Sequence, residues 1–151
     1  QELWLGGLGL GRRPLHGPRG HLTRLNGQDF QNTQGANMVQ RIDVGARMSE
    51  VAIHNGTVYL AGQIAEVPGQ DIEGQTRQVL AAIDALLAKA GTDKSKIVMT
   101  QIFLTDLSDF AGMNRVWDAW VVPGHTPPRA TVQAQLANPD WKIEVVVTAA
   151  L

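Results

Sequence analysis

The chain contains no cysteine and no long hydrophobic run. The absence of cysteine excludes disulfide bonds, thiolate zinc sites, iron–sulfur clusters and thiol nucleophiles, so a reducing cytoplasm is the compartment we expect. No segment approaches the roughly 20 apolar residues that a bilayer-spanning helix needs, and we therefore expect no membrane partner. Stability and chemistry have to come from a packed core and from other residue types.

The chain also has no large excess of charge of either sign. The formal net charge of the 151 residues is −1, and a chain of this length suits one domain. Residues 1 to 37 carry +2, which leaves −3 for the rest of the chain. We therefore expect no nucleic-acid partner for the main part of the chain.

Motifs for metals, nucleotides and serine nucleophiles are missing. The glycine-rich residues 6 to 11 lack both a preceding strand and the full dinucleotide fingerprint. There is no nucleophile-elbow sequence. Four histidines are scattered without metal-ligand spacing: His16, His21, His54 and His125. The sequence implies no cofactor.

Residues 1 to 37 have neither helical nor strand periodicity and are rich in glycine, arginine and polar amides. Their apolar opening precedes Arg12 and Arg13, which is the reverse of the order in a secretory signal. We expect this segment to be a non-native or disordered extension, with Met38 as the start of a domain over residues 38 to 151.

Regular patterns begin at residue 51. Two β-rich runs, 51 to 54 and 57 to 61, flank Asn55-Gly56, the strongest two-residue signal for a hairpin. Apolar residues then recur at helical spacing from 72 to 90, where Asp71 and Gly91 suit the two caps. The run 97 to 104 predicts a strand parallel to an earlier one.

A second helix is expected after a cap at Ser108 or Asp109 and before Pro123 and Gly124. Its apolar stripe is read as core rather than as a cofactor site. The stripe comprises Phe110, Met113, Trp117 and Trp120.

Two alternating strands close the domain. We expect the apolar set of each to meet the helices: Ala130, Val132, Ala134 and Leu136 in the first, and Ile143, Val145, Val147 and Ala149 in the second. The order β-β-α-β-α-β-β predicts an α+β fold, a mixed sheet with two helices on one face. The bare face then needs a partner.

This alternation places Arg129 and Glu144 together on the face away from the helices. A hairpin turning at residues 137 to 141 would separate them by roughly 17 Å along the strands, too far for one small ligand. They would meet if neighbouring subunits of a closed ring each gave one residue to a shared cleft. The alternative is that each charge is solvated or bonded locally.

Three segments resemble the RidA/YjgF (reactive intermediate deaminase) family in the right order. Residues 58 to 64, VYLAGQI, are similar to a conserved strand of that family, and residues 75 to 91 to its first helix. The third segment runs from residue 103 to 144. Its residues 103 to 114 resemble one stretch of the family, and PPRATV at 127 to 132, followed by Ile143-Glu144, resembles the family signature.

The resemblance implies a homotrimer with a chorismate-mutase-like fold. Its interfacial clefts would bind small carboxylates and, in active members, hydrolyse enamines or imines released by pyridoxal-phosphate enzymes. Arg129 would hold the substrate carboxylate with two hydrogen bonds, and Glu144 would activate water. The implied substrate-binding residues are Gly62, Asn114, Ala130, Thr131 and Met48.

Some of these roles have structural alternatives. Gly62 suits a close backbone approach to the ligand or a β-bulge, and Asn114 suits the cleft or a local cap. Thr131 stands where the family often has cysteine, and its backbone amide would serve the carboxylate. Ala61 replaces a usual serine, and a familiar tyrosine is missing near Met48, which bears on substrate preference.

Two other functions stay open. A non-catalytic protein that senses a small carboxylate such as a 2-keto acid would need only Arg129. Ribonuclease activity is also compatible with the resemblance, but the −3 charge and the lack of a basic stripe argue against it.

Overall fold

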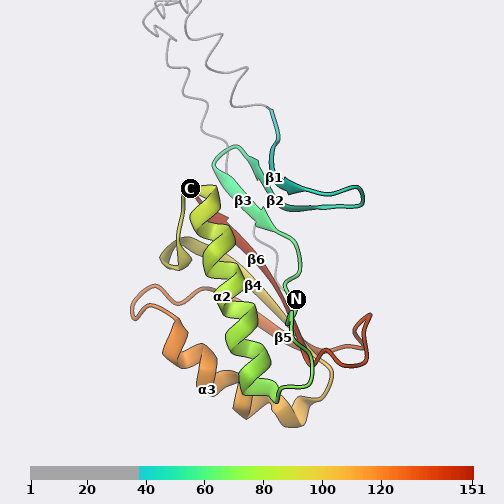
Figure 1. The fold of residues 1–151 in the computed structure, drawn as a ribbon. Coiled ribbons are helices and arrows are strands. Elements are labelled where there is room, and N and C mark those ends of the chain that lie inside the picture. Colours follow the sequence, from blue (N-terminus) through green and yellow to red (C-terminus); the bar gives the residue numbers. More distant parts are fainter. Residues whose placement is uncertain (1–37) are drawn as a thin grey trace, which may run out of the picture.

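A computed structural model describes residues 38–151 of the chain, so the expectations for residues 1 to 37 lie outside the described residues. The described part has the predicted α+β fold, a mixed sheet with two α-helices (Figure 1). Its strands are β1 (Gln40–Val44), β2 (Ser49–His54), β3 (Thr57–Leu60), β4 (Ile97–Leu104), β5 (Arg129–Gln133) and β6 (Ile143–Ala150). Its helices are α2 (Ile72–Ala90) and α3 (Phe110–Trp120).

The six strands are ordered β1-β2-β3-β6-β4-β5. Only β4 and β5 are parallel neighbours. Because β3 and β4 both run antiparallel to β6, they are parallel to each other, as predicted for the strand after the first helix. Strand β1 was not predicted, because its mostly exposed sequence QRIDV shows no apolar alternation.

Local sequence signals explain how the elements begin and end. Asn55 and Gly56 both have positive φ, 49° and 74°, as a two-residue hairpin turn requires. Asp71 accepts a hydrogen bond from the Gly74 backbone N–H at the start of α2, and Gly91 ends the helix in the left-handed region.

The start of α3 differs in detail from the prediction. A 3-10 turn, η2 (Leu107–Asp109), precedes the helix, and the carboxylate of Asp106 accepts the Ser108 N–H. Asp109 makes no side-chain cap bond. Asp109 is nevertheless the N-cap residue of α3, as predicted, and the hydrogen-bonded cap at Asp106 belongs to η2, a short turn that apolar periodicity does not reveal.

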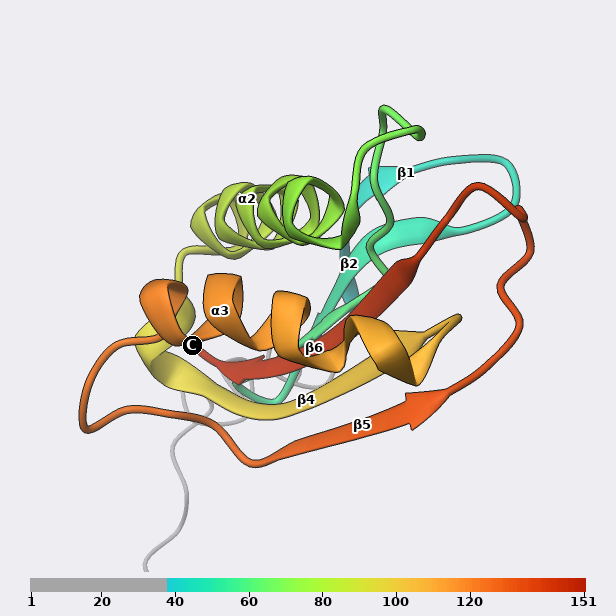
Figure 2. The same cartoon turned by 90° about the horizontal axis from the view of Figure 1, so that it is seen from below.

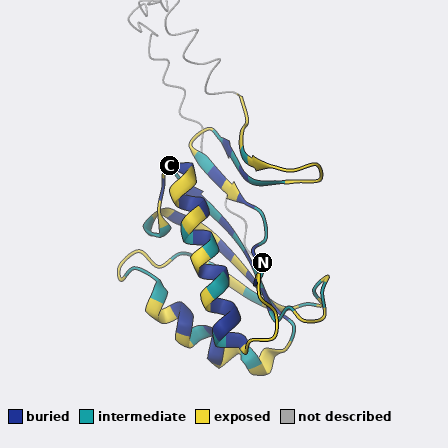
Figure 3. Ribbon diagram, in the orientation of Figure 1, coloured by how far each residue is buried: buried dark blue, intermediate teal, exposed yellow. Residues whose placement is uncertain are grey.

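Both helices pack on one face of the sheet, and the core lies between the helices and the sheet (Figures 2 and 3). The predicted inward set of β6 is buried throughout: Ile143, Val145, Val147 and Ala149. The other face, here called the uncovered face, carries apolar side chains that are open in a single chain. Tyr59, Met99 and Val132 on this face are 50%, 42% and 48% exposed.

The predicted orientation of β5 is wrong. Arg129 pairs with Thr100, which is fully buried, so Arg129 lies on the helix side and Ala130 and Val132 lie on the uncovered face. Alternation gives the period of a strand but not which face its apolar set occupies. Here the uncovered face also carries apolar side chains, which inverts the assignment. Ala134 and Leu136 lie beyond the end of β5.

The predicted pairing of the last two strands is also wrong. Strand β6 lies between β3 and β4, whereas β5 pairs with β4 at the edge of the sheet. The segment from 134 to 142 is therefore a connection across β4 rather than a hairpin turn. The proximity of two strands in sequence does not decide which strands become hydrogen-bonded neighbours.

Candidate functional site

Arg129 lies at the start of β5, beneath one side of α3. Its Nη1 donates a hydrogen bond to Oδ1 of Asn114 at 2.8 Å and lies 3.9 Å from Sδ of Met113. Its Cζ lies 5.1 Å from the ring centroid of Trp117 and 5.9 Å from that of Phe110. We call these five residues the Arg129 cluster.

The four helical members of the Arg129 cluster share one face of α3. Their numbers, 110, 113, 114 and 117, follow the three-and-four spacing that places side chains above one another on a helix. The apolar stripe therefore has two roles. Met113 and Trp117 are buried in the core, as predicted, while Phe110 is 41% exposed and lies at the guanidinium.

The guanidinium of Arg129 has no acidic partner within residues 38–151. The side chain is half-buried, and its polar contacts are an amide oxygen and a thioether sulfur, both neutral. An arginine has five N–H donors, so the bond to Asn114 leaves enough for a two-pronged contact with a carboxylate. This arrangement holds a positive charge without neutralising it.

Glu144 lies on the uncovered face, against the backbone of Gly62. A Cβ on residue 62 would overlap Oε1 of Glu144 and come within 2.9 Å of its Cδ. Gly62 follows β3, and its neighbour Gln63 is bridged to Val145 of β6. The glycine therefore leaves free the space that the Glu144 side chain occupies. Within residues 38–151 this carboxylate forms no ion pair.

Arg129 and Glu144 do not share a face, contrary to prediction. Arg129 pairs with Thr100 of β4, and Glu144 pairs with Phe103, three residues further along. Two strand spacings across the sheet and three residues along it separate their Cα atoms by about 14 Å, on opposite faces. One chain does not bring both to one small ligand.

The remaining predicted residues are divided among three places. Asn114 belongs to the Arg129 cluster. Thr131 is on the same side as Arg129, with a buried hydroxyl that has no hydrogen-bond partner, and Ala130 is on the uncovered face. Met48 is half-exposed in the turn between β1 and β2, at the far edge of the sheet from β5.

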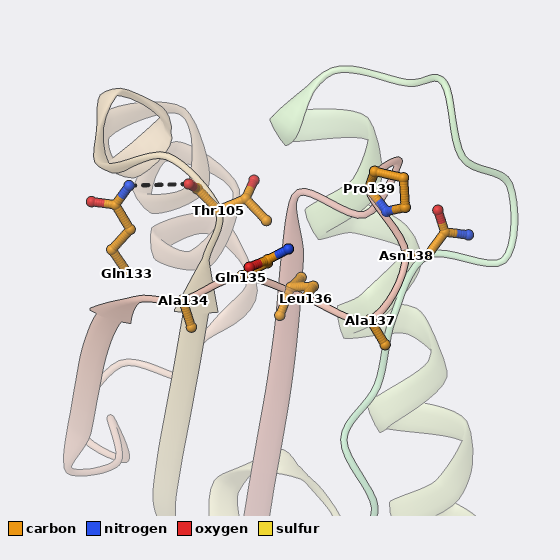
Figure 4. A pocket seen from close by; sticks show the side chains of 8 residues that line it. All are labelled: Thr105, Gln133, Ala134, Gln135, Leu136, Ala137, Asn138 and Pro139. Atoms are coloured by element: carbon orange, nitrogen blue, oxygen red, sulfur yellow. Dashed lines mark hydrogen bonds between the residues drawn. The ribbon is translucent and has the colours of Figure 1, made fainter.

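A cavity at the end of β5 is lined by neither Arg129 nor Glu144. It has a volume of about 610 Å³ and lies where the chain leaves β5, beside Thr105 (Figure 4). Gln133 lines this cavity, and its side-chain amide donates a hydrogen bond to the Thr105 carbonyl at 3.1 Å. The lining is mostly amide and small apolar side chains, with no charged group to recognise an anion: Thr105, Gln133, Ala134, Gln135, Leu136, Ala137, Asn138 and Pro139.

Two further observations concern residues 38–151. They contain no group of three or more His, Cys, Asp or Glu side chains arranged to hold a metal ion. No helix among them is long and apolar enough to cross a membrane.

Sequence reasoning missed the contacts of Phe110 and Trp117 with Arg129. The available signal was the coincidence of Asn114, a polar residue, with the apolar stripe at the same helical spacing. A polar residue within an apolar stripe needs a partner, and the partner is Arg129.

The chain is similar to known proteins in sequence and in fold. A family model described as Endoribonuclease L-PSP matches residues 38–151. A RutC family protein of Haemophilus ducreyi is 53% identical over 114 residues, which cover 76% of this chain and 97% of that protein. The RutC family protein YoaB of Escherichia coli K12 is 51% identical over 113 residues, covering 75% of this chain and 98% of its own.

Solved structures share the same fold. A member of the YjgF protein family from Neisseria meningitidis superposes with a TM-score of 0.74 at 42% identity, covering 76% of this chain and 96% of its own. A protein of the conserved Rid family from Yersinia pestis gives 0.65 at 33% identity, covering 72% and 90%.

Proposed function

The chain belongs to the family described as Endoribonuclease L-PSP, whose members also carry the names YjgF, RutC and Rid, and we propose that it hydrolyses reactive 2-imino acids. The products would be a 2-keto acid and ammonia. Imines of alanine size or slightly larger, 2-iminopropanoate and 2-iminobutanoate, are the substrates we propose. No cofactor takes part in this reaction.

The observation that carries the proposal is the unneutralised guanidinium of Arg129. A half-buried positive charge held by neutral groups attracts a small anion, and the planar fork matches a carboxylate. Each proposed substrate has one carboxylate next to its reacting carbon. Binding at Arg129 would therefore fix the imine carbon a short distance from the guanidinium. Thr131 and Ala130 would contribute backbone at this end of the ligand.

Glu144 is the proposed base. Its carboxylate would accept a proton from water as the water oxygen bonds to the iminium carbon, giving a tetrahedral carbinolamine. The same carboxyl group would return the proton to nitrogen. As the carbon–nitrogen bond breaks and ammonia leaves, the hydroxyl proton would pass to the Glu144 carboxylate, which leaves the carbonyl group of the 2-keto acid. Gly62 makes the room in which the Glu144 side chain lies.

The active site would be shared between copies of the chain. Arg129 and Glu144 are on opposite faces of one sheet, so the Arg129 of one copy has to meet the Glu144 of the next. A heterologous contact of this kind forms a closed ring when the rotation between copies completes a full turn. We propose a homotrimer in which the apolar uncovered face is buried and Met48 and Asn114 line the clefts.

The second candidate is a protein that binds a small carboxylate and turns nothing over. It is favoured by one observation: the Arg129 cluster is complete within one chain, whereas the pair Arg129 and Glu144 is not. Such a protein would sense a 2-keto acid through Arg129 alone.

Ribonuclease activity, which the family description names, receives less support from this chain. Residues 38–151 hold nine basic and twelve acidic side chains, a charge of −3. RNA binding by phosphate contacts needs a basic surface and weakens steeply with salt. A nuclease should therefore show salt-sensitive RNA binding, which we do not expect here.

The proposal is tested by making the imino acids in situ with an amino-acid oxidase. The release of ammonia, or the loss of a semicarbazone product, would be followed with wild type, Arg129→Ala and Glu144→Gln. Spontaneous imine breakdown is the baseline.

We expect wild type to accelerate breakdown and Arg129→Ala to lose this acceleration. Glu144→Gln should lose turnover but keep affinity for the 2-keto acid, because the amide cannot accept the proton. A folded oligomer that accelerates no imine of any size would overturn the deaminase and leave the carboxylate-binding protein.

A further inference from the structure

Trp117 is the buried aromatic member of the Arg129 cluster. Its ring centroid lies 5.1 Å from Cζ of Arg129, compared with 5.9 Å for the exposed Phe110. A guanidinium within about 6 Å of an aromatic centroid is attracted by the negative face of the ring. Trp117, only 6% exposed, is the closer and more firmly packed of the two aromatic supports.

The ring of Trp117 is in turn supported by a second indole, that of Trp120. It packs against Trp120 with centroids 5.4 Å apart and planes tilted by 50°. The indole N–H of Trp120 donates to Oδ2 of Asp84 on α2 at 2.9 Å. A continuous set of contacts therefore runs from α2 through two indoles to the guanidinium of Arg129.

These contacts orient the guanidinium without cancelling its charge. A carboxylate in the place of Trp117 would pair with Arg129 and compete with any ligand. An indole provides attraction and a flat surface but no negative charge, so the remaining N–H donors stay available. We infer that Trp117 is a positioning residue, whose ring holds the Arg129 guanidinium in the orientation that binds a carboxylate. The inference rests on the proposed function, in which Arg129 binds the substrate carboxylate.

The expected effect falls on binding rather than on the chemical step. Arg129 would hold the carboxylate equally in substrate and transition state, so a misplaced guanidinium raises KM and leaves kcat nearly unchanged. Trp117→Leu keeps an apolar side chain, although a smaller one, and removes the π face, and we expect carboxylate affinity to fall about tenfold. Trp117→Phe keeps a ring and should stay within about threefold of wild type.

The test compares two ligands of the same shape and different charge. The dissociation constants of 2-oxobutanoate and of its neutral amide are measured by NMR titration of the full chain, alongside steady-state KM and kcat. Val116→Ala is the matched control, because Val116 is buried on α3 but makes no polar or cation–π contact with Arg129. Arg129→Ala is measured in the same series.

Selective loss of 2-oxobutanoate binding in Trp117→Leu, with the amide unaffected and Trp117→Phe close to wild type, supports the inference. Equal losses for Trp117→Leu and Val116→Ala, or for acid and amide, would show that Trp117 matters only for packing and would overturn it. If Arg129→Ala binds 2-oxobutanoate as wild type does, the failure belongs to the proposed function.

Discussion

At the scale of single residues, a substitution at Gly62 tests the position of the Glu144 carboxylate most directly. Gly62→Ala places a methyl group where the carboxylate of Glu144 lies, and this flexible side chain has to move away. We expect the fold to be retained, imine turnover to fall by at least about tenfold, and affinity for a 2-keto acid to be kept. Ammonia release and ligand titration measure the two effects separately. Loss of affinity together with turnover would contradict the separation of Glu144 from the Arg129 cluster.

A second prediction for a single residue concerns the effect of Thr100 on stability. It is fully buried on the strand beside Arg129, and its hydroxyl has no hydrogen-bond partner. A buried polar group without a partner lowers stability, so Thr100→Val should raise the free energy of unfolding by about 1 kcal/mol. Denaturant unfolding at one fixed protein concentration measures this. The control is Thr76→Val, because the buried Thr76 hydroxyl does bond to the Ile72 carbonyl and its loss should not stabilise.

At the scale of elements, the turn between β2 and β3 sets the register of the hairpin. Gly56 has a φ of 74°, and a Cβ there would meet no atom within 4 Å, so any cost comes from the backbone alone. Gly56→Ala should lower the free energy of unfolding by about 1 kcal/mol. Asn55→Gly, at the other positive-φ position, should change it by less than half as much. Equal effects in thermal melting would argue against this turn geometry.

The sequence was most informative where a local rule decides the outcome. Helix α2, its caps at Asp71 and Gly91, and the Asn55-Gly56 turn depend on neighbours in sequence, and all were predicted. The buried set of β6 also followed from alternation. Fold class and family were recognisable because several such segments occur in one order.

Long-range pairing was not recoverable in the same way. The placement of β6 between β3 and β4 depends on sheet topology, which no local pattern records. The face that the apolar set of β5 occupies depends on the character of the uncovered face, which carries exposed apolar side chains. The same inversion explains why Arg129 was assigned to the wrong side. Its contacts with Trp117 and Phe110 arise only once α3 is packed above β5.

At the scale of the whole molecule, the uncovered face predicts assembly. Tyr59, half-exposed in one chain, lies on this face within β3. Tyr59→Asp would bury a charge if copies pack there, so we expect the oligomer to dissociate and imine turnover to be lost. Sedimentation velocity measures the state of assembly. Leu107→Asp is the matched control, because Leu107 is equally exposed but lies in the turn before α3. An unchanged oligomer in Tyr59→Asp would place the interface elsewhere.

The central claim is that one copy supplies Arg129 and another supplies Glu144 to each active site. Subunits of Arg129→Ala and Glu144→Gln, each inactive alone, would be mixed in equal amounts, dissociated and reassembled. The imine deaminase activity of the mixture is then measured. Random reassembly should restore about a quarter of wild-type activity, because that share of heterologous interfaces joins an intact Arg129 to an intact Glu144. No recovery in mixed oligomers confirmed by mass would contradict the shared site.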